Sequence, residues 1–218
     1  MTDTIQARDG AVKITFIGHA TFFLEWDGKV VHVDPVGQYA DYSRLPKADL
    51  VLVTHEHGDH MDPAAVRTLG KPGTVVVGNP AAAARLAAGA VALRHGETRE
   101  FQGISVEAVP AYNTSSGHTQ FHPKGRDNGY VLTLGGLRLY VAGDTEDIPE
   151  MKKLHDIDVA FLPMNQPYTM TPEQAAAAAR ILRPRILYPY HFGETDTARL
   201  AVLLQDIPGI EVRIRNMK

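Results

Sequence analysis

The segment ADLVLVTHEHGDH, residues 48–60, decides how this chain folds and what it can bind. Its apolar run 50–53 is typical of a buried strand, and Gly58 lets the backbone turn sharply soon after that strand ends. Alternate residues of an extended chain face the same way. Four side chains with metal-binding donor atoms are therefore expected to converge at the carboxyl end of the strand: His55, His57, Asp59 and His60. Imidazole and carboxylate groups are ligands for zinc, manganese and iron, so the segment predicts a metal site rather than a chance cluster of surface histidines.

The rest of the chain alternates short apolar runs with helical segments. Predicted strands cover residues 12–17, 21–25, 29–33, 50–53, 74–77, 104–109, 130–134, 137–142, 159–162, 186–190 and 211–214. Predicted helices cover residues 63–69, 81–88, 148–154, 172–182 and 197–204. Asp62 and Asn79 each precede a proline and are expected to cap helices, and Gly135-Gly136 predicts a two-residue hairpin. No internal sequence repeat is visible. The pattern predicts an α/β fold with one domain over residues 1–218, a four-layer α/β/β/α sandwich in which two sheets pack face to face.

Composition narrows the function classes. The chain has 218 residues, 44% of them hydrophobic and 22% charged, which suits a single sizeable core. Lys and Arg number 22 against 25 Asp and Glu, the net charge is −3, and no block of like charges marks a nucleic-acid arm. Nucleic acid is therefore not favoured as a partner. Cysteine is absent, which excludes disulfides, thiolate metal ligands and a cysteine nucleophile, so every metal ligand must be a nitrogen or oxygen donor.

The first residues, MTDTIQ, have neither a basic region nor an apolar one, and no stretch is apolar enough to predict a membrane span. We expect a cytoplasmic protein that acts on a small molecule. The sequence is compatible with a homo-oligomer and leaves the oligomeric state open.

Other predicted strands also end in groups that can bind metal. Asp144 follows Gly143 after the strand 137–142, and His191 follows the strand 186–190. Gly-Asp is a common turn, and a lone histidine at a strand end is more often a core residue. Beside the histidine cluster, however, a carboxylate could bridge two metal ions and His191 could supply a further donor.

Four further positions are candidates for parts of the same site. His118 and His122 lie in the long loop 110–128, and one of them is expected to complete the site. His19 and Asp34 end predicted strands, where they are either simple strand-end caps or partners that orient a ligating imidazole. The remaining histidines lack such a context and are expected to be structural, surface or turn residues: His32, His95 and His155.

The order and spacing of these motifs resemble the metallo-β-lactamase superfamily. The resemblance covers residues 12–193 and rests on five motifs: Gly18-His19-Ala20-Thr21, Asp34-Pro35, the run from Thr54 to His60, Gly143-Asp144-Thr145 and Pro189-Tyr190-His191. It is greatest toward the small metal-dependent hydrolase branch, which includes proteins similar to L-ascorbate-6-phosphate lactonase and N-acyl phosphatidylethanolamine phospholipase D. The resemblance implies the metallo-β-lactamase form of the four-layer sandwich.

The resemblance also implies roles for the candidate ligands. His55 and His57 would serve one metal ion, Asp59, His60 and His191 a second, and Asp144 would bridge the two. Many relatives place a further histidine of the first ion where this chain has Ala111-Tyr112-Asn113. Either Asn113 is a weak substitute, or His118 or His122 supplies the ligand from the loop, and His122 is favoured.

The expected function is metal-dependent hydrolysis of an ester, lactone or phosphodiester by a metal-bridging hydroxide, with Asp59 as both ligand and catalytic residue. Two divalent ions are expected, zinc first, with manganese, iron or nickel as alternatives. Lys124 and Arg126 could hold an anionic substrate group or could be ordinary solvated loop charges. The competing hypothesis is a metal-binding sensor or redox protein on the same fold, without hydrolytic turnover.

Overall fold

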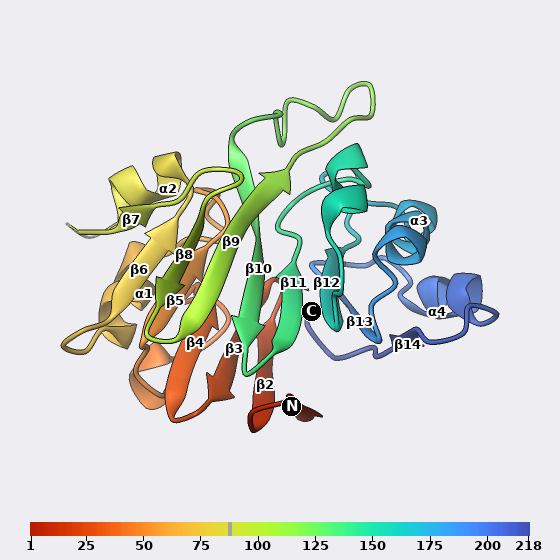
Figure 1. Cartoon of the computed structure of the whole chain (residues 1–218). Helices are drawn as coiled ribbons and strands as arrows, with labels where there is room; N and C mark the ends of the chain where they lie inside the picture. Colours follow the sequence, from red (N-terminus) through yellow and green to blue (C-terminus); the bar gives the residue numbers. More distant parts are fainter. Residues whose placement is uncertain (87–88) are drawn as a thin grey trace.

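Two seven-stranded sheets pack face to face with helices on their outer sides in the computed structural model (Figure 1). The structure describes residues 1–86 and 89–218. Each sheet consists of strands that are consecutive in the sequence, β1 to β7 in one and β8 to β14 in the other. The predicted α/β sandwich is confirmed, with the two mixed sheets forming its inner layers.

The first sheet changes from antiparallel to parallel at β4. Its strands are β1 (Thr2–Gln6), β2 (Ala11–Gly18), β3 (Thr21–Trp26), β4 (Lys29–Val33), β5 (Leu50–Val53), β6 (Val75–Gly78) and β7 (Val91–Ala92). Strands β1 to β4 pair antiparallel, whereas β4 to β7 pair parallel. The parallel strands need crossover connections, and these carry the helices.

The second sheet repeats this order of pairings. Its strands are β8 (Thr98–Phe101), β9 (Ile104–Ala111), β10 (Asp127–Leu134), β11 (Leu137–Val141), β12 (Val159–Pro163), β13 (Ile186–Tyr190) and β14 (Glu211–Val212). Strands β8 to β11 pair antiparallel and β11 to β14 pair parallel. Leu134 pairs with Leu137 across Gly135-Gly136, which confirms the predicted hairpin.

Helices begin where the sequence places caps. They are α1 (Pro63–Leu69), α2 (Pro80–Arg85), α3 (Pro172–Leu182) and α4 (Ala198–Leu204), with two short 3-10 helices, η1 (Tyr42–Arg44) and η2 (Pro149–Lys153). The Asp62 side chain accepts a hydrogen bond from the backbone of α1, and the Asn79 side chain accepts one from the backbone of α2. Both of these helices begin with proline. Both predicted caps are therefore confirmed.

Some predicted boundaries were wrong. The helix expected over 148–154 is the 3-10 helix η2. The helix expected over 81–88 corresponds to α2, which begins one residue earlier and ends at Arg85, and residues 87 and 88 are outside the described part of the chain. Strands β1, β7 and β8 were not predicted. Strand β1 buries only Ile5, and β8 has no fully buried side chain, so neither shows the apolar alternation that marks a strand in the sequence.

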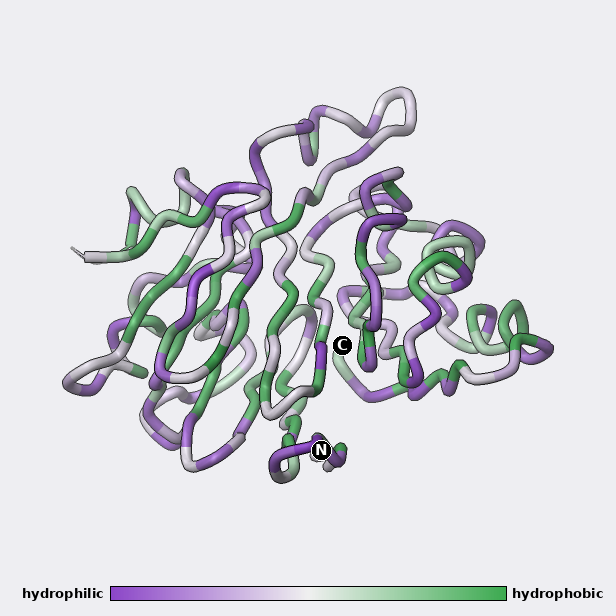
Figure 2. Tube along the Cα trace, in the orientation of Figure 1, coloured by the Kyte–Doolittle hydropathy of each residue, from purple (hydrophilic) through white to green (hydrophobic). Residues whose placement is uncertain are grey.

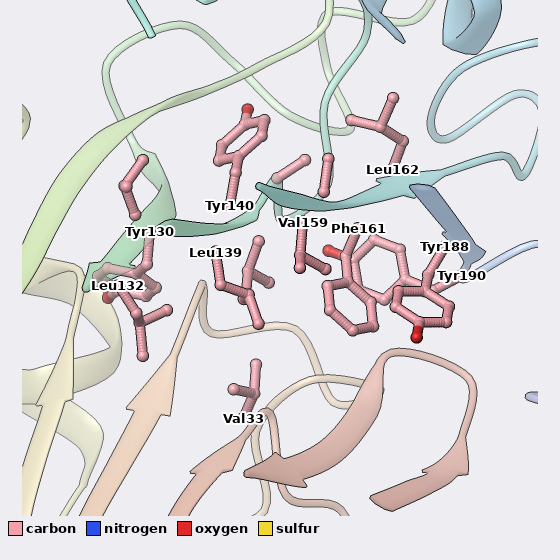
Figure 3. Close-up of a cluster of buried hydrophobic side chains, with 14 of the residues drawn as sticks. Val33, Tyr130, Leu132, Leu139, Tyr140, Val159, Phe161, Leu162, Tyr188 and Tyr190 are labelled. Carbon is pink, nitrogen blue, oxygen red and sulfur yellow. The ribbon is translucent and has the colours of Figure 1, made fainter. Parts of the chain in front are cut away.

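The core lies between the two sheets. Hydrophobic stretches follow the strands, whereas the connecting turns are mostly hydrophilic (Figure 2). Phe22 of β3 stacks on Phe161 of β12, with ring centroids 4.2 Å apart, and thereby joins the two sheets. Figure 3 shows Leu139 on the side of β11 that faces Val33, with Tyr140 on the opposite side. Among residues 1–86 and 89–218, no helix is both long and apolar enough to cross a membrane.

Candidate metal centre

Strand ends from both sheets meet at one edge of the sandwich and bring the candidate ligands together. His55 follows β5, Asp144 lies just beyond β11, His191 follows β13, and His19 lies between β2 and β3. The backbone N–H of His191 donates to the carbonyl of His19 at 2.9 Å, which ties the first sheet to the second at this point. The site therefore draws on strand ends from both sheets.

The backbone at these strand ends adopts unusual conformations. His19, Asp34 and His191 have φ values of 54°, 43° and 46°, a left-handed region that side chains other than glycine rarely occupy. Gly143 has φ 66°, and a Cβ there would lie 2.5 Å from the carbonyl oxygen of Asn128. Only glycine fits at that position, directly before Asp144. Such strained conformations cluster at functional sites.

Asp144 lies at the centre of four histidine side chains. Its carboxylate is 3.3 Å from Nε2 of each of three histidines and 3.9 Å from Nε2 of the fourth: His60, His122, His191 and, at the longer distance, His55. The Asp144 side chain is almost completely buried. A single carboxylate surrounded by imidazoles in this way could lie between two cations.

The donor atoms fall into overlapping groups, each with all its atoms within 4.8 Å of one another. The first group is His55, His57 and His122, the second is His19, Asp59, His60 and His191, and the third is His55, His60 and Asp144. All donors are nitrogen or oxygen, a set that suits zinc and other divalent transition metals.

Several of these atoms are buried without a hydrogen-bond partner. They are Nε2 of His55, Nε2 of His60, both ring nitrogens of His191 and Oδ1 of Asp144. Buried polar atoms are nearly always paired in folded proteins, because an unpaired one costs about 1–3 kcal/mol. Unpaired nitrogens and a carboxylate oxygen that face one another are the arrangement that a bound cation would satisfy.

Buried carboxylates hold the far sides of two histidine rings. Asp34 lies 2.8 Å from Nδ1 of His60 and also accepts hydrogen bonds from the backbone N–H and the hydroxyl of Thr54. Asp127 lies 2.9 Å from Nδ1 of His122. A carboxylate on one ring nitrogen fixes the tautomer and directs the other nitrogen toward a metal.

The electrostatics suit a site that exchanges protons for cations. Burial opposes charge on His60, but Asp144 and Asp34 outweigh it, so the pKa of His60 lies well above its usual value. Burial, together with the neighbouring His60, lowers the pKa of His55 well below the ordinary histidine value. Burial alone would raise the pKa of Asp144, but the surrounding histidines hold it well below the usual carboxyl range. The negative charge of Asp144 is therefore maintained, and a cation could replace the proton on His60.

Comparisons with known proteins agree with this geometry. A family model for the beta-lactamase superfamily domain matches residues 13–191. A UPF0173 metal-dependent hydrolase from Pelotomaculum thermopropionicum is 32% identical over 93% of this chain and 96% of its own length. Another, from Thermus thermophilus, is 35% identical over 83% of this chain and 84% of its own length. The chain belongs to the UPF0173 metal-dependent hydrolase family of the beta-lactamase superfamily.

Solved structures give the same result. A protein from Parabacteroides distasonis, described as a metal-dependent hydrolase, superposes with a TM-score of 0.96 at 51% identity and covers 100% of this chain and 99% of its own. Igni18, a metallo hydrolase from Ignicoccus hospitalis, has a TM-score of 0.80 at 27% identity, with 94% and 95% covered. The predicted superfamily and its metallo-β-lactamase fold are confirmed for this family member.

The loop residues that sequence analysis left open have separate positions in this hydrolase. His122 joins His55 and His57, whereas Nδ1 of His118 lies 3.2 Å from the Glu146 carboxylate instead. The Asn113 amide donates to the backbone carbonyls of Tyr168 and His118, which makes it a link between loops. The structure therefore brings His122 into the cluster and leaves His118 and Asn113 outside the three donor groups.

The two residues that could hold an anionic substrate group, Lys124 and Arg126, form ion pairs within the protein. Nζ of Lys124 lies 2.9 Å from Glu150 and donates to the Tyr112 hydroxyl, and Arg126 pairs with Asp127 at 2.6 Å. Neither cation is among the residues that line the cavity over the donor cluster, although Nη2 of Arg126 lies 3.2 Å from Nε2 of the candidate ligand His57.

The structure adds residues that the sequence did not reveal and separates others from the site. Asp127 was not predicted, because nothing nearby in the sequence marks the aspartate at the start of β10 as a partner of His122. His19 was expected at most to orient a ligand, but its Nε2 lies 3.1 Å from Asp59 and within a donor group. Of the histidines expected to lie outside the site, His32 is buried against Pro46, His95 lies in a turn and His155 is exposed.

Proposed function

We propose that this member of the metal-dependent hydrolase family holds two divalent cations at the strand-end cluster and uses them to hydrolyse an ester-type small molecule. One ion would lie among His55, His57 and His122 and the other among Asp59, His60 and His191, with Asp144 between them. The convergence of buried donor atoms that have no hydrogen-bond partner is the observation that carries this proposal. A shared carboxylate between two cations is the arrangement used by two-metal hydrolases.

The protein residues have distinct roles in this proposal. Divalent cations held here would activate water for attack on a carbonyl or phosphoryl centre and stabilise the charge that develops. Asp59 is the half-exposed carboxylate of the cluster, and its contacts with His19 and His191 fix its orientation toward the cavity. Those neighbours also offset the effect of burial and hold the pKa of Asp59 far below the usual carboxyl range. Asp59 would therefore stay ionised and could orient the attacking water.

Metal analysis provides the direct test. Protein purified without chelator should contain two divalent ions per chain by elemental analysis, with zinc expected first, and anomalous scattering should place them beside Asp144. Chelation should lower the thermal unfolding temperature and abolish hydrolysis of lactones, phosphodiesters and thioesters, because a site present only in the folded state adds its binding energy to stability. His155→Ala, which removes an exposed histidine, is the matched control and should leave metal content unchanged.

Two results would contradict the proposal. Chelated protein that melts at the same temperature and keeps its activity would exclude a metal enzyme. Bound metal without turnover of any ester class would favour the alternative of a sensor or redox protein on this fold.

A further inference from the structure

The cavity over the donor cluster has a wall that the metal chemistry does not use. It measures about 210 Å³, and its lining includes three residues that are not candidate ligands: Phe121, Asn165 and Tyr168. Phe121 comes from the loop between β9 and β10, and the other two come from the loop between β12 and α3. The same two loops therefore supply the part of the cavity that a substrate's non-reacting group would contact.

The aromatic side chains of this wall form a pair that the backbone holds in place. The rings of Phe121 and Tyr168 have centroids 4.9 Å apart and lie nearly edge to face at 73°. The Asn113 amide donates to the Tyr168 carbonyl at 2.7 Å, and Arg126 donates to the Phe121 carbonyl at 2.8 Å. The Tyr168 residue is 44% exposed, so part of the pair is open to a ligand. The pair is a preformed apolar surface.

The described residues of this wall offer no lysine or arginine to an anionic group of the substrate. None of the described residues that line the cavity is lysine or arginine, and the cations nearest in sequence are already paired with Glu150 and Asp127. Asp59 and Asp144 also line the cavity. Both carboxylates are candidate metal ligands, so beyond the reacting centre a phosphate or carboxylate group would find no lysine or arginine among the described lining residues to bind it.

Asn165 adds one uncharged polar group to the wall. No hydrogen bond to its side-chain amide is found among the described residues, so the amide is free to bind a ligand. A Cβ on Gly193, which has φ 50°, would lie 3.2 Å from Oδ1 of Asn165, and the glycine thereby leaves room for this side chain. An amide in this position can donate a hydrogen bond to a neutral ester oxygen.

From these features we infer the substrate class, an inference that rests on the proposed hydrolase function. The substrate is an uncharged carboxylic ester or lactone whose aromatic or bulky apolar part packs on Phe121 and Tyr168, while Asn165 binds an oxygen of the ester. Water adds to the acyl carbon, the bond from that carbon to the alcohol oxygen breaks, and the products are a carboxylic acid and an alcohol, or one hydroxy acid from a lactone. A phosphodiester is disfavoured because the wall has no lysine or arginine to bind the negative charge that it retains.

Three probes separate the contributions of the wall in the metal-loaded protein. Dihydrocoumarin is a neutral lactone with an aromatic ring, γ-butyrolactone has no ring to pack, and bis(4-nitrophenyl) phosphate is an anionic diester with aromatic groups. We expect the acceleration over the uncatalysed rate to follow that order. Phe121→Ala and Tyr168→Ala should raise KM for dihydrocoumarin about 5- to 10-fold, with little change in kcat, and should leave γ-butyrolactone unaffected. Asn165→Ala should lower kcat/KM for both lactones, by up to about tenfold.

Controls keep these effects specific to the wall. Tyr168→Phe keeps the ring and should behave as wild type, and Val202→Ala removes apolar surface at a position 53% exposed on α4. Binding of 1-indanone, a neutral ketone that cannot be hydrolysed, is measured by saturation-transfer NMR and should weaken by the same factor in the two ring variants. This measurement tests the wall even if no substrate is turned over, so failure of the hydrolase proposal is recognised separately.

The inference is overturned if both alanine variants bind 1-indanone as tightly as wild type. It is also overturned if bis(4-nitrophenyl) phosphate shows the greatest acceleration of the three probes. In the second case hydrolysis itself would still stand, and only the substrate class would change.

Discussion

The two halves of this protein, β1 to β7 and β8 to β14, have the same order of antiparallel and parallel strands but contribute different chemistry. In the first half, the loop after β5 carries His55 to His60, whereas in the second half the corresponding loop, after β12, carries Asn165 and Tyr168. The first half joins its second and third strands by a tight turn that contains His19, and the second half joins the corresponding strands by the long loop that contains His122.

The comparison indicates that the two halves bring equivalent strand ends to one site and that their loops contribute different functional groups. The first half supplies most of the donor atoms, and the second half supplies the central carboxylate, two outer histidines and the cavity wall. Sites built on strand ends are held more precisely than sites on loops, so we expect the two halves to respond differently to substitution.

The largest difference should be between the aspartates that follow β4 and β11. Asp144→Asn should remove metal and lower kcat by several orders of magnitude, because the amide lacks the charge that offsets two cations. Asp34→Asn should weaken metal binding only about 10- to 100-fold, because Asp34 orients His60 from behind and does not face the cations. Elemental analysis and steady-state kinetics measure both effects. Near-normal occupancy and rate in Asp144→Asn would contradict a bridging role.

The next difference concerns the long loop of the second half. His122→Ala should lose the ion held with His55 and His57, because water would fill the coordination position left by the imidazole less tightly. His118→Ala and Asn113→Ala should keep this ion, because neither residue belongs to a donor group. Calorimetric titration of the three variants with zinc decides between them. If His118→Ala is the damaging variant, the loop closes differently from its position here, and if none matters, a dinuclear mechanism must be abandoned.

A pH measurement sharpens the comparison at two equivalent buried positions. His32 in β4 and Tyr140 in β11 each pair with the second residue of the next parallel strand, and each has an unpaired buried polar atom. Burial lowers the pKa of His32 to about 4 and raises that of Tyr140, so both favour the neutral form. The unfolded chain then binds the His32 proton more readily than the folded chain, and His32 makes stability fall as the pH decreases from about 6.5 to about 4.

The expected loss at pH 5 relative to pH 7 is about 2 kcal/mol in the free energy of unfolding. Urea unfolding of wild type and His32→Gln at both pH values measures it, and the difference between the two proteins removes any common contribution from metal release. Equal pH dependence in the two proteins would show that His32 is not responsible. Tyr140→Phe should leave this dependence unchanged, because a tyrosine does not titrate in this range.

The smallest effect is expected at the tight turn of the first half. His19→Ala should lower the binding affinity for the ion held by Asp59, His60 and His191 about tenfold. The reason is that Asp59 loses the imidazole, 3.1 Å away, that orients it. Competition with a metal-binding dye measures the affinity of each ion separately. If His19→Ala abolishes binding of that ion altogether, His19 is a full ligand, and the two halves contribute more equally than we propose.

The sequence determined those features that depend on neighbouring residues. Apolar runs such as 50–53 and capping residues such as Asp62 are local signals, and most strands and helices lie where these signals place them. The grouping of His55 with His57 also follows locally, from alternate positions after one strand end, whereas the turn at residues 58–60 places Asp59 in a different donor group with His60.

Only the tertiary structure decided which distant residues meet. The sequence favoured His122 over Asn113 and His118 only through the family resemblance, because a loop's course depends on partners such as Glu146 and Asp127 that lie elsewhere in the fold. The polar edge strand β1 pairs with β2 without an apolar pattern of its own. The pairing of Lys124 with Glu150 likewise became visible only in three dimensions, because the free energy of an ion pair depends on distance and burial rather than on sequence order.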